Sequence, residues 1–262
     1  VSLLHRYDGG LRVPTGLFLA LRKQLHEKFQ FEEQQELKPV KFGLQKLTGF
    51  TRLYQEDCVR AMVQAAQTGG GLVLCATGSG KTFISARFLS ALQGNACFIV
   101  DELTLLRQAK RELETVMEEP VGQIGESVFE PKRVTIATVQ TLAIYCRNLK
   151  YKEWAKKLQV IVVDEIHTML AWMLKRRKNA AVIDQLQPLA VFGLTATLNL
   201  VKANVRLRAY ALAGPVCYEY KYQEAKSQGY LSQGTVVQVL IPTPMTDIHA
   251  SPDSRAGGQV AI

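Results

Sequence analysis

Short apolar segments rich in β-branched residues alternate with longer amphipathic stretches through the middle of the chain. Each apolar segment is followed by polar or glycine-containing residues and then by a stretch with helical spacing. This order is typical of βαβ units, and near-continuous apolar strands indicate a parallel sheet covered by helices on both faces. We therefore predict an α/β fold with strands at residues 71–75, 96–100, 134–137, 160–163 and 189–194, and helices at 54–67, 81–93, 103–117, 139–149 and 167–178.

The two ends of the chain lack this alternation. Residues 14–29 form one isolated amphipathic stretch with Pro14 in its first turn, which predicts an accessory helix. Residues 241–262 contain three prolines, two glycines and few apolar side chains, as linkers do. We expect a small N-terminal accessory segment at 1–47, a core domain at 48–235 and a linker at 236–262.

The composition is that of an ordinary folded protein. Of the 262 residues, 47% are hydrophobic and 21% are charged, which excludes a disordered, collagen-like or coiled-coil chain. No apolar run approaches the roughly 18 residues that span a bilayer, so we expect no membrane partner. The net charge of +9 is concentrated toward both ends. Such an excess fits a nucleic-acid partner, although a merely solvated basic surface would have the same composition.

Five cysteines and four histidines are scattered along the chain, without the spacing of metal ligands. No C-x-x-C pair occurs, and an odd, scattered set of cysteines argues against both a disulfide framework and a zinc site. The region after Val1 lacks the basic start and the apolar stretch of a secretory signal. We expect reduced thiols and a cytoplasmic protein.

The first predicted strand is followed by ATGSGKT, Ala76 to Thr82. Glycines let backbone N–H groups face a phosphate there, and the next helix adds the positive end of its dipole. Lys81 would reach the β and γ phosphates of a nucleotide, and the Thr82 hydroxyl would hold Mg²⁺. The alternative is a strand-to-helix turn without a ligand. The residues expected to bind the nucleotide here are Thr77, Gly78, Ser79, Gly80, Lys81 and Thr82.

The fourth predicted strand delivers two acids, Asp164 and Glu165, at its carboxyl end, where open α/β sheets bind ligands. Asp164 suits Mg²⁺, which takes one or two carboxylates and keeps several waters. Glu165 suits the base that orients and polarises an attacking water. Alone, such a pair is often only a favourable charge pair at a helix N-terminus. Following the lysine of the glycine-rich loop in a chain of βα units, the pair indicates hydrolysis of a nucleoside triphosphate.

The segments ATGSGKT, DEIH and GLTAT, in this order, resemble the superfamily 2 helicases and translocases of the DExH branch. The family's phosphate loop reads A-x-x-G-x-G-K-T, which accounts for Cys75 at the place where the general pattern has glycine. The resemblance implies the N-terminal RecA-like motor domain of an ATP-dependent helicase. Its P-loop NTPase fold would bind ATP and Mg²⁺, with Lys81, Asp164 and Glu165 as the catalytic residues.

The resemblance extends to the segment before the phosphate loop and to the segment after the fifth predicted strand. Arg52 and Gln55 match the family's R-x-Y-Q element, which implies that Gln55 reads the adenine edge and Arg52 packs on its ring. His167 of DEIH would bridge to GLTAT, where the hydroxyls of Thr195 and Thr197 couple ATP turnover to nucleic-acid movement.

Nucleic-acid contacts are implied by two further segments. Residues 134–142 are similar to the family's T-T-x-Q-S-L element, whose Thr138 and Gln140 positions touch the nucleic-acid backbone. The segment after the second predicted strand departs from the family pattern V-P-T-x-x-L-x-x-Q, because two acids replace its proline and threonine. Acids repel phosphodiesters, and Arg107 is the residue that could compensate, unless it only belongs to a solvated helix face.

The partner domain of the family's motor has no counterpart in this sequence. No Q-x-x-G-R-x-x-R box occurs, so its arginine fingers are missing, and a finger is worth roughly 10³ to 10⁵ in rate. We expect a monomer that binds ATP but hydrolyses it feebly and cannot unwind a duplex alone. Residues 218–232 resemble the exit toward a second RecA-like domain, so 236–262 is either a linker or the start of that domain.

The substrate class is indicated by residues 6–17, which are similar to phage helicases of the UvsW type and repair helicases of the XPB type. This implies DNA, with RNA left open, and the host cytoplasm if the chain is phage-encoded. Two alternatives to a helicase remain: the translocase part of a type I or type III restriction subunit, and an ATP-gated nucleic-acid-binding module without turnover. A P-loop kinase or transport ATPase would lack the R-x-Y-Q and T-A-T segments, which are present.

Overall fold

The structure is a computed structural model that describes most of the predicted core domain. The described residues are 5–7, 10–12, 39–43, 49–50, 52–145, 148–175, 186, 188–198 and 202–230. The accessory helix predicted at 14–29 and the segment 236–262 lie outside them, so the domain boundaries remain predictions. Within the accessory segment, β1 (His5–Tyr7) and β2 (Gly10–Arg12) form an antiparallel hairpin.

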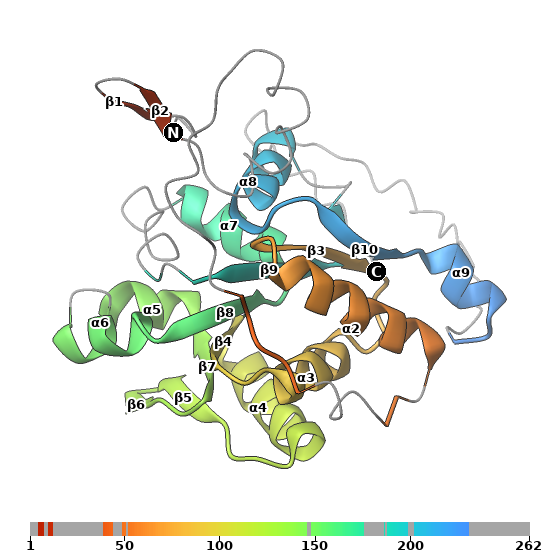
Figure 1. The fold of residues 1–262 in the computed structure, drawn as a ribbon, viewed down its shortest axis with the longest axis horizontal. Helices are drawn as coiled ribbons and strands as arrows, with labels where there is room; N and C mark the ends of the chain where they lie inside the picture. The colour runs from red at the N-terminus through yellow and green to blue at the C-terminus, as the bar shows by residue number, and fades with distance from the viewer. Residues whose placement is uncertain are drawn as a thin grey trace, which may run out of the picture. The chain divides into compact units, whose positions relative to one another are not determined.

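One eight-stranded sheet organises the described core (Figure 1). Its strand order is β10-β3-β9-β8-β4-β7-β5-β6. All neighbouring strands are parallel except β5 and β6, which form an antiparallel hairpin at one edge. The strands are β3 Gly70–Cys75, β4 Asn95–Val100, β5 Gly122–Gly125, β6 Val128–Glu130, β7 Val134–Thr138, β8 Leu158–Val163, β9 Ala190–Thr195 and β10 Val216–Tyr220.

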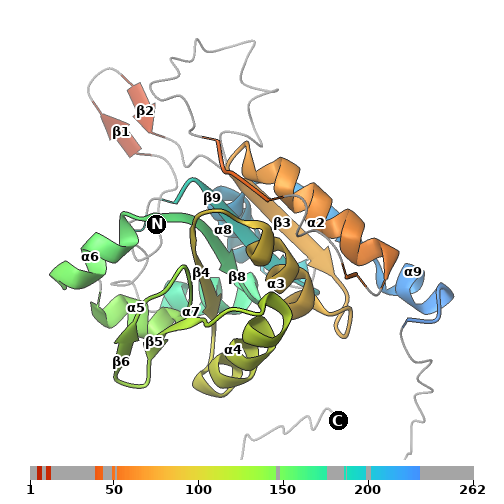
Figure 2. The ribbon, with the colours of Figure 1, turned by 60° about the horizontal axis from the view of Figure 1, so that its bottom comes forward.

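Helices cover both faces of this sheet, as the sequence predicts for near-continuous apolar strands (Figures 1 and 2). Three of them, α2, α3 and α4, pack against one face, and α5 to α8 pack against the other. The helices are α2 Leu53–Ala66, α3 Lys81–Ala91, α4 Leu103–Met117, α5 Val139–Tyr145, α6 Leu149–Ala155, α7 Ile166–Lys175, α8 Ala203–Ala213 and α9 Tyr222–Ser227.

Successive residues of each central strand supply these two separate cores. In β8, Val160 and Val162 face α2, α3 and α4, whereas Ile161 and Val163 face the opposite layer, and all four are fully buried. Complete burial of such a side chain stabilises the fold by about 1.5 to 3 kcal/mol relative to exposure. A strand that buries both faces needs apolar residues at every position, which explains why the central strands read as unbroken apolar runs.

The predicted RecA-like α/β class and all five predicted strands are confirmed, but one predicted helix is wrong. Residues 139–149 do not form a single helix, because α5 ends at Tyr145 and α6 begins at Leu149. Asn148 has an extended backbone and its side chain accepts a hydrogen bond from Lys150 N at 2.8 Å. A side-chain cap of this kind begins a new helix. The sequence analysis also did not predict β5, β6, β10, α6, α8 or α9.

The parallel arrangement positions the candidate site. Because β3, β4, β7, β8 and β9 run in the same direction, the loops that follow them meet at one edge of the sheet. Those loops contain every motif that the sequence analysis linked to ATP turnover, apart from R-x-Y-Q at the start of α2. Among the described residues, no helix combines the length and apolar character that crossing a membrane requires.

Candidate functional site

The phosphate loop joins the buried strand β3 to α3. Gly78 and Gly80 have φ angles of 80° and 81°, in the left-handed region that side chains with a Cβ rarely adopt. Gly80 is the N-cap of α3 and has no side chain to bind the first amides of the helix. Those amides therefore point toward the loop, as they do where a helix N-terminus binds an anion.

Lys81 is the first residue of α3, and the structure brings it together with an acid from the turn that follows β8. Its Nζ lies 3.1 Å from Glu165 Oε1, and the Lys81 side chain is only 12% exposed. The two residues belong to different βα units, so the fold rather than local sequence creates this pair. A partly buried lysine beside a glycine-rich loop is a cation that can exchange its carboxylate partner for a phosphate.

The two acids of DEIH have different surroundings. Burial raises the pKa of Asp164, and the nearby Glu165 charge raises it further, while Lys81 opposes the shift. Asp164 Oδ1 accepts a hydrogen bond from Glu165 N at 3.1 Å. Glu165 has a φ of 44°, a conformation that costs a non-glycine residue about 1 to 3 kcal/mol and concentrates at functional sites. Its buried Oε2 has no hydrogen-bond partner among the described residues and lies 3.4 Å from His167 Nδ1.

The coupling residues predicted in DEIH and GLTAT lie side by side. His167 Nδ1 is 2.8 Å from Thr195 Oγ1, which also accepts a hydrogen bond from Thr197 N at 3.2 Å. The close approach depends on Gly193, because a Cβ built there would collide with the Ile166 side chain of α7. The structure thus joins the start of α7 to the end of β9 through one partly buried side-chain hydrogen bond.

The R-x-Y-Q element lies directly against the phosphate loop. Gln55 is buried, and its Nε2 donates to the Ser79 carbonyl at 3.4 Å. Arg52 donates to the Tyr54 hydroxyl at 2.9 Å and lies over the Tyr230 ring, 5.1 Å from its centroid. Sequence reasoning missed Tyr54, whose hydroxyl donates to the Ser79 carbonyl at 2.6 Å. In the sequence, Tyr54 is one position of the R-x-Y-Q element, and no role was predicted for it.

The two predicted nucleic-acid residues at the end of β7 and the start of α5 are hydrogen-bonded within the protein. Thr138 is 2% exposed, and its hydroxyl lies 2.9 Å from Thr141 Oγ1 at the start of α5. Gln140 donates from Nε2 to Asp101 Oδ1 at 3.4 Å. The acid that departs from the family pattern is therefore bonded to a residue predicted to contact the nucleic-acid backbone.

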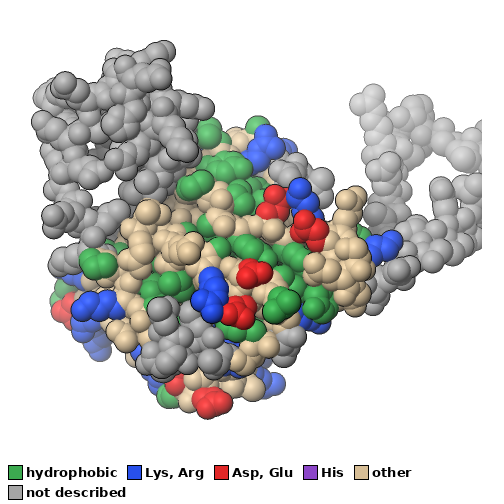
Figure 3. Space-filling view, turned by 45° about the vertical axis from the view of Figure 1, so that its right-hand side comes forward, with side chains coloured by type: hydrophobic (Ala, Val, Ile, Leu, Met, Phe, Trp, Pro, Cys, Tyr) green, Lys and Arg blue, Asp and Glu red, His purple; other side chains and the backbone are tan. Residues whose placement is uncertain are grey.

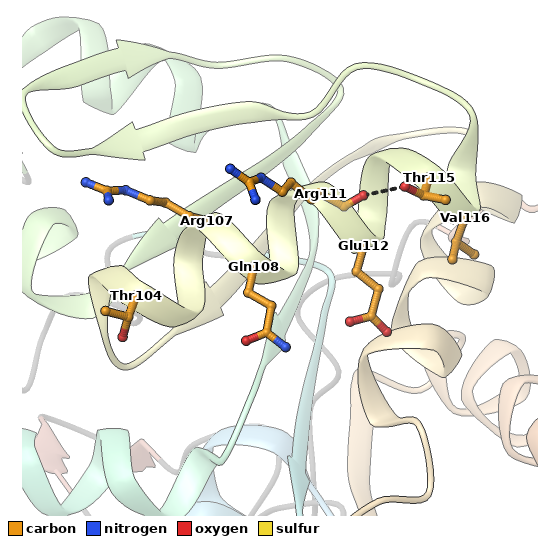
Figure 4. A pocket seen from close by; sticks show the side chains of 7 residues that line it. All are labelled: Thr104, Arg107, Gln108, Arg111, Glu112, Thr115 and Val116. Atoms are coloured by element: carbon orange, nitrogen blue, oxygen red, sulfur yellow. Dashed lines mark hydrogen bonds between the residues drawn. The ribbon is translucent and has the colours of Figure 1, made fainter.

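Arg107 is also held by an acid. Its guanidinium makes two hydrogen bonds to the carboxylate of Glu126, with Nε to Oε2 at 3.1 Å. The Arg107 side chain is nevertheless 68% exposed. It lies beside a hollow of about 550 Å³ along α4, where Figure 4 shows Arg107 and Arg111 extending to one side of the helix and Gln108 and Glu112 to the other. The hollow is thus lined by charges of both signs.

The surface charge is mixed elsewhere as well. On the face shown in Figure 3, the described Lys and Arg side chains are interspersed with Asp, Glu and apolar side chains. The described part of this face therefore has no continuous basic patch. Any nucleic-acid contact on it would depend on individual side chains rather than on a single positive surface.

Comparison with known proteins identifies the family to which this arrangement belongs. The family model described as "Type III restriction enzyme, res subunit" (ResIII) matches residues 50–200, more than half of the chain. The chain belongs to the ResIII family. The match supports the prediction, made from the order of the motifs, of a RecA-like domain of the superfamily 2 DExH type. The matched range contains R-x-Y-Q, the phosphate loop, DEIH and GLTAT.

Curated relatives match the ResIII domain at lower identity. The "General transcription and DNA repair factor IIH helicase/translocase subunit XPB" of Encephalitozoon cuniculi is 24% identical over 229 residues, which cover 82% of this chain and 33% of that protein. The "DNA 3'-5' helicase XPB" of Mycobacterium tuberculosis is 26% identical over 190 residues, 68% of this chain and 32% of that protein. The chain therefore spans about a third of the length of these relatives.

A solved structure agrees with the fold. The crystal structure of the UvsW helicase from bacteriophage T4 superposes with a TM-score of 0.61 and 20% identity, and the match covers 83% of this chain and 82% of that one. At this identity the likeness establishes the fold of the ResIII domain and leaves its activity to be argued from the site.

Proposed function

We propose that this ResIII domain is the ATP-binding motor domain of a DNA helicase or translocase, and that it couples ATP hydrolysis to movement on DNA. One observation carries the proposal: Lys81 of the phosphate loop and Glu165 of DEIH meet at 3.1 Å. The relatives that are named as DNA helicases and translocases support DNA as the substrate.

The residues present fit a nucleotide with Mg²⁺. Two left-handed glycines open the loop, and Lys81 supplies a positive charge beside it. The buried Asp164 has a raised pKa, so a bound cation would stabilise its ionised form. Lys81 would hold the β and γ phosphates, while Thr82 and Asp164 would hold Mg²⁺. When bound, the metal would neutralise charge on the phosphates.

Glu165 is the proposed general base. While Lys81 pairs with Glu165, Oε1 of the carboxylate is occupied and therefore less free to bind a water. Transfer of Lys81 to a phosphate would release Glu165 Oε1 to accept a proton from the attacking water. The remaining oxygen, Oε2, faces His167, which is bonded to Thr195. This chain of contacts is the proposed route by which turnover reaches GLTAT.

The isolated domain is expected to be a weak ATPase. The sequence contains no Q-x-x-G-R-x-x-R box, so we propose that a second RecA-like domain must supply the arginines. The alternative is an ATP-gated DNA-binding module, in which ATP would only change the affinity for DNA. A restriction-type translocase is also compatible with the family name.

Binding of DNA and RNA to the 262-residue protein tests the proposal. Fluorescence anisotropy with matched DNA and RNA strands should show tighter DNA binding that changes when ATP and Mg²⁺ are added. A preference for RNA would refute DNA as the substrate. Measurable phosphate release that Glu165→Gln abolishes supports the motor, whereas an unchanged background rate in that variant favours the binding module.

A further inference from the structure

The phosphate loop is bonded near both ends to two tyrosines that lie outside it, through the backbone of Tyr220 and the side chain of Tyr54. At the start of the loop, Ala76 N donates to the Tyr220 carbonyl at 3.3 Å. Near its end, the Tyr54 hydroxyl donates to the Ser79 carbonyl at 2.6 Å. The rings of Tyr54 and Tyr220 stack on each other with centroids 4.0 Å apart and planes within 10° of parallel. One aromatic pair therefore joins the two ends of the loop.

The Ser79 carbonyl matters because it belongs to the same peptide unit as the Gly80 amide. A trans peptide is planar, so its C=O and N–H groups point in opposite directions and must turn together. Tyr54 donates to the Ser79 oxygen at 2.6 Å, closer than Gln55 Nε2 at 3.4 Å, and so helps to fix the direction in which the Gly80 N–H points. Gly80 lies at the N-terminus of α3, where backbone amides face a bound phosphate. Tyr54 therefore orients a phosphate-binding group without touching the phosphate.

The stacked pair also connects the loop to the end of the described chain. Tyr220 is the last residue of β10 and pairs in register with Cys75, the residue before the loop. Its hydroxyl donates to Gln228 Oε1 at 2.8 Å, which fastens the segment that follows, α9. The Tyr230 ring lies 5.5 Å from the Tyr54 ring. The β10–α9 segment, residues 216–230, is thereby attached to the phosphate loop through two buried rings.

We propose that Tyr54 and Tyr220 are positioning residues for the phosphate loop, and that through them the β10–α9 segment and ATP binding control each other. The inference rests on the proposed ATP site and goes beyond it, because neither tyrosine belongs to the loop. Thermodynamic linkage requires the coupling to be reciprocal. Displacement of the segment weakens ATP binding, and bound ATP orders the segment.

Titration of the 262-residue protein with the fluorescent nucleotide mant-ATP and Mg²⁺ tests the positioning role. Tyr54→Phe keeps the ring stack and removes the bond to Ser79, so its Kd for mant-ATP should rise about fivefold, the effect of one lost hydrogen bond. Tyr220→Leu removes the stack and should raise Kd about tenfold, whereas Tyr220→Phe keeps the ring and should restore Kd to within about twofold of the original. The double variant Tyr54→Phe/Tyr220→Leu should be no weaker than Tyr220→Leu alone, because both act on one carbonyl.

A matched variant separates positioning from general stability. Tyr218→Leu removes a tyrosine from the same strand, β10, whose ring packs against the core and has no described contact with Tyr54 or the loop. It should lower Tm about as much as Tyr220→Leu and leave Kd within about twofold. Equal effects of Tyr218→Leu and Tyr220→Leu on Kd, or additive effects in the double variant, would overturn the inference.

Hydrogen exchange tests the reciprocal half of the coupling. Mant-ATP should slow amide exchange in α9 in the original protein, and the slowing should be lost in Tyr54→Phe. An amide exchange rate in α9 that does not change when mant-ATP binds would refute the coupling. Lys81→Ala serves as the separate marker of the proposed ATP site. If the original protein fails to bind mant-ATP, or if Lys81→Ala binds it equally well, the proposed function fails whatever the tyrosine variants do.

Discussion

Replacing Lys81 by alanine and Glu165 by glutamine should shift ATP affinity in opposite directions. Each substitution breaks the same ion pair, in which Nζ and Oε1 lie 3.1 Å apart. Only the first removes the cation that would bind the phosphates. The second releases that cation from its internal partner. The two variants should therefore lose similar folding stability and differ in nucleotide binding.

The magnitudes follow from the exposure of the pair. The Glu165 side chain is 34% exposed, so solvent screening limits the pair to about 1 kcal/mol or less. Glu165→Gln should then tighten ATP binding by at most about fivefold. Charge-assisted hydrogen bonds from Lys81 to phosphate are worth about 1.5 to 3 kcal/mol, less what the lysine gives up with Glu165. A net loss of about 0.5 to 2 kcal/mol means that Lys81→Ala should weaken binding about 2- to 30-fold.

Equilibrium titration with mant-ATP at saturating Mg²⁺ measures both changes, and phosphate release in single turnover shows whether hydrolysis is lost in both variants. Thermal melting without nucleotide is the control, since matched Tm values show that only the nucleotide contact differs. Weaker binding in both variants would mean that the ion pair supports the site rather than competes with the phosphates. Intact affinity in Lys81→Ala would remove the ATP assignment altogether.

Three further predictions concern the residues around this pair. His167→Ala should leave the Kd for mant-ATP within about twofold but abolish the change in DNA affinity caused by ATP, and a preserved change in DNA anisotropy would contradict the coupling role. Glu126→Gln releases Arg107 and should steepen the salt dependence of DNA binding by about one phosphate contact; Glu56→Gln, which breaks a similar exposed pair on α2, should not. Asp164 has a raised pKa, so its ionised form costs stability above that pKa and the cost disappears at low pH. In EDTA, Asp164→Asn should therefore raise Tm at pH 7.5 and not at pH 3, and an equal Tm shift at both would disprove this.

The central strands could be predicted because they are buried on both faces and therefore read as continuous apolar runs. The elements that were missed lack such a signal. In α8 the buried residues are mostly small, including Ala209, Ala211 and Ala213, so no apolar stripe marks the helix. The β5–β6 hairpin turns at Glu126 and Ser127, two left-handed residues without the usual asparagine or glycine. Both elements depend on tertiary contacts that override local preference.

The candidate site was predictable where chemistry demands particular residues at particular ends of strands. The strand, glycine-rich loop and helix order pointed to Lys81, and the end of the fourth strand pointed to Glu165, but their roles remain predictions. Contacts made by side chains from distant segments could not be anticipated. The stack of Tyr54 on Tyr220 joins the first helix of the core to its last strand, and no spacing rule relates the two.

Gly193 determines how closely α7 approaches β9 beside the hydrogen bond between His167 and Thr195. Because Gly193 presents only a hydrogen atom to the Ile166 side chain, that side chain packs directly on the backbone of β9. This packing holds the start of α7 close to β9, where His167 Nδ1 lies 2.8 Å from Thr195 Oγ1. A close-packed contact of this kind transmits a small displacement of DEIH to the neighbouring strand, whereas a loosely packed interface would absorb it.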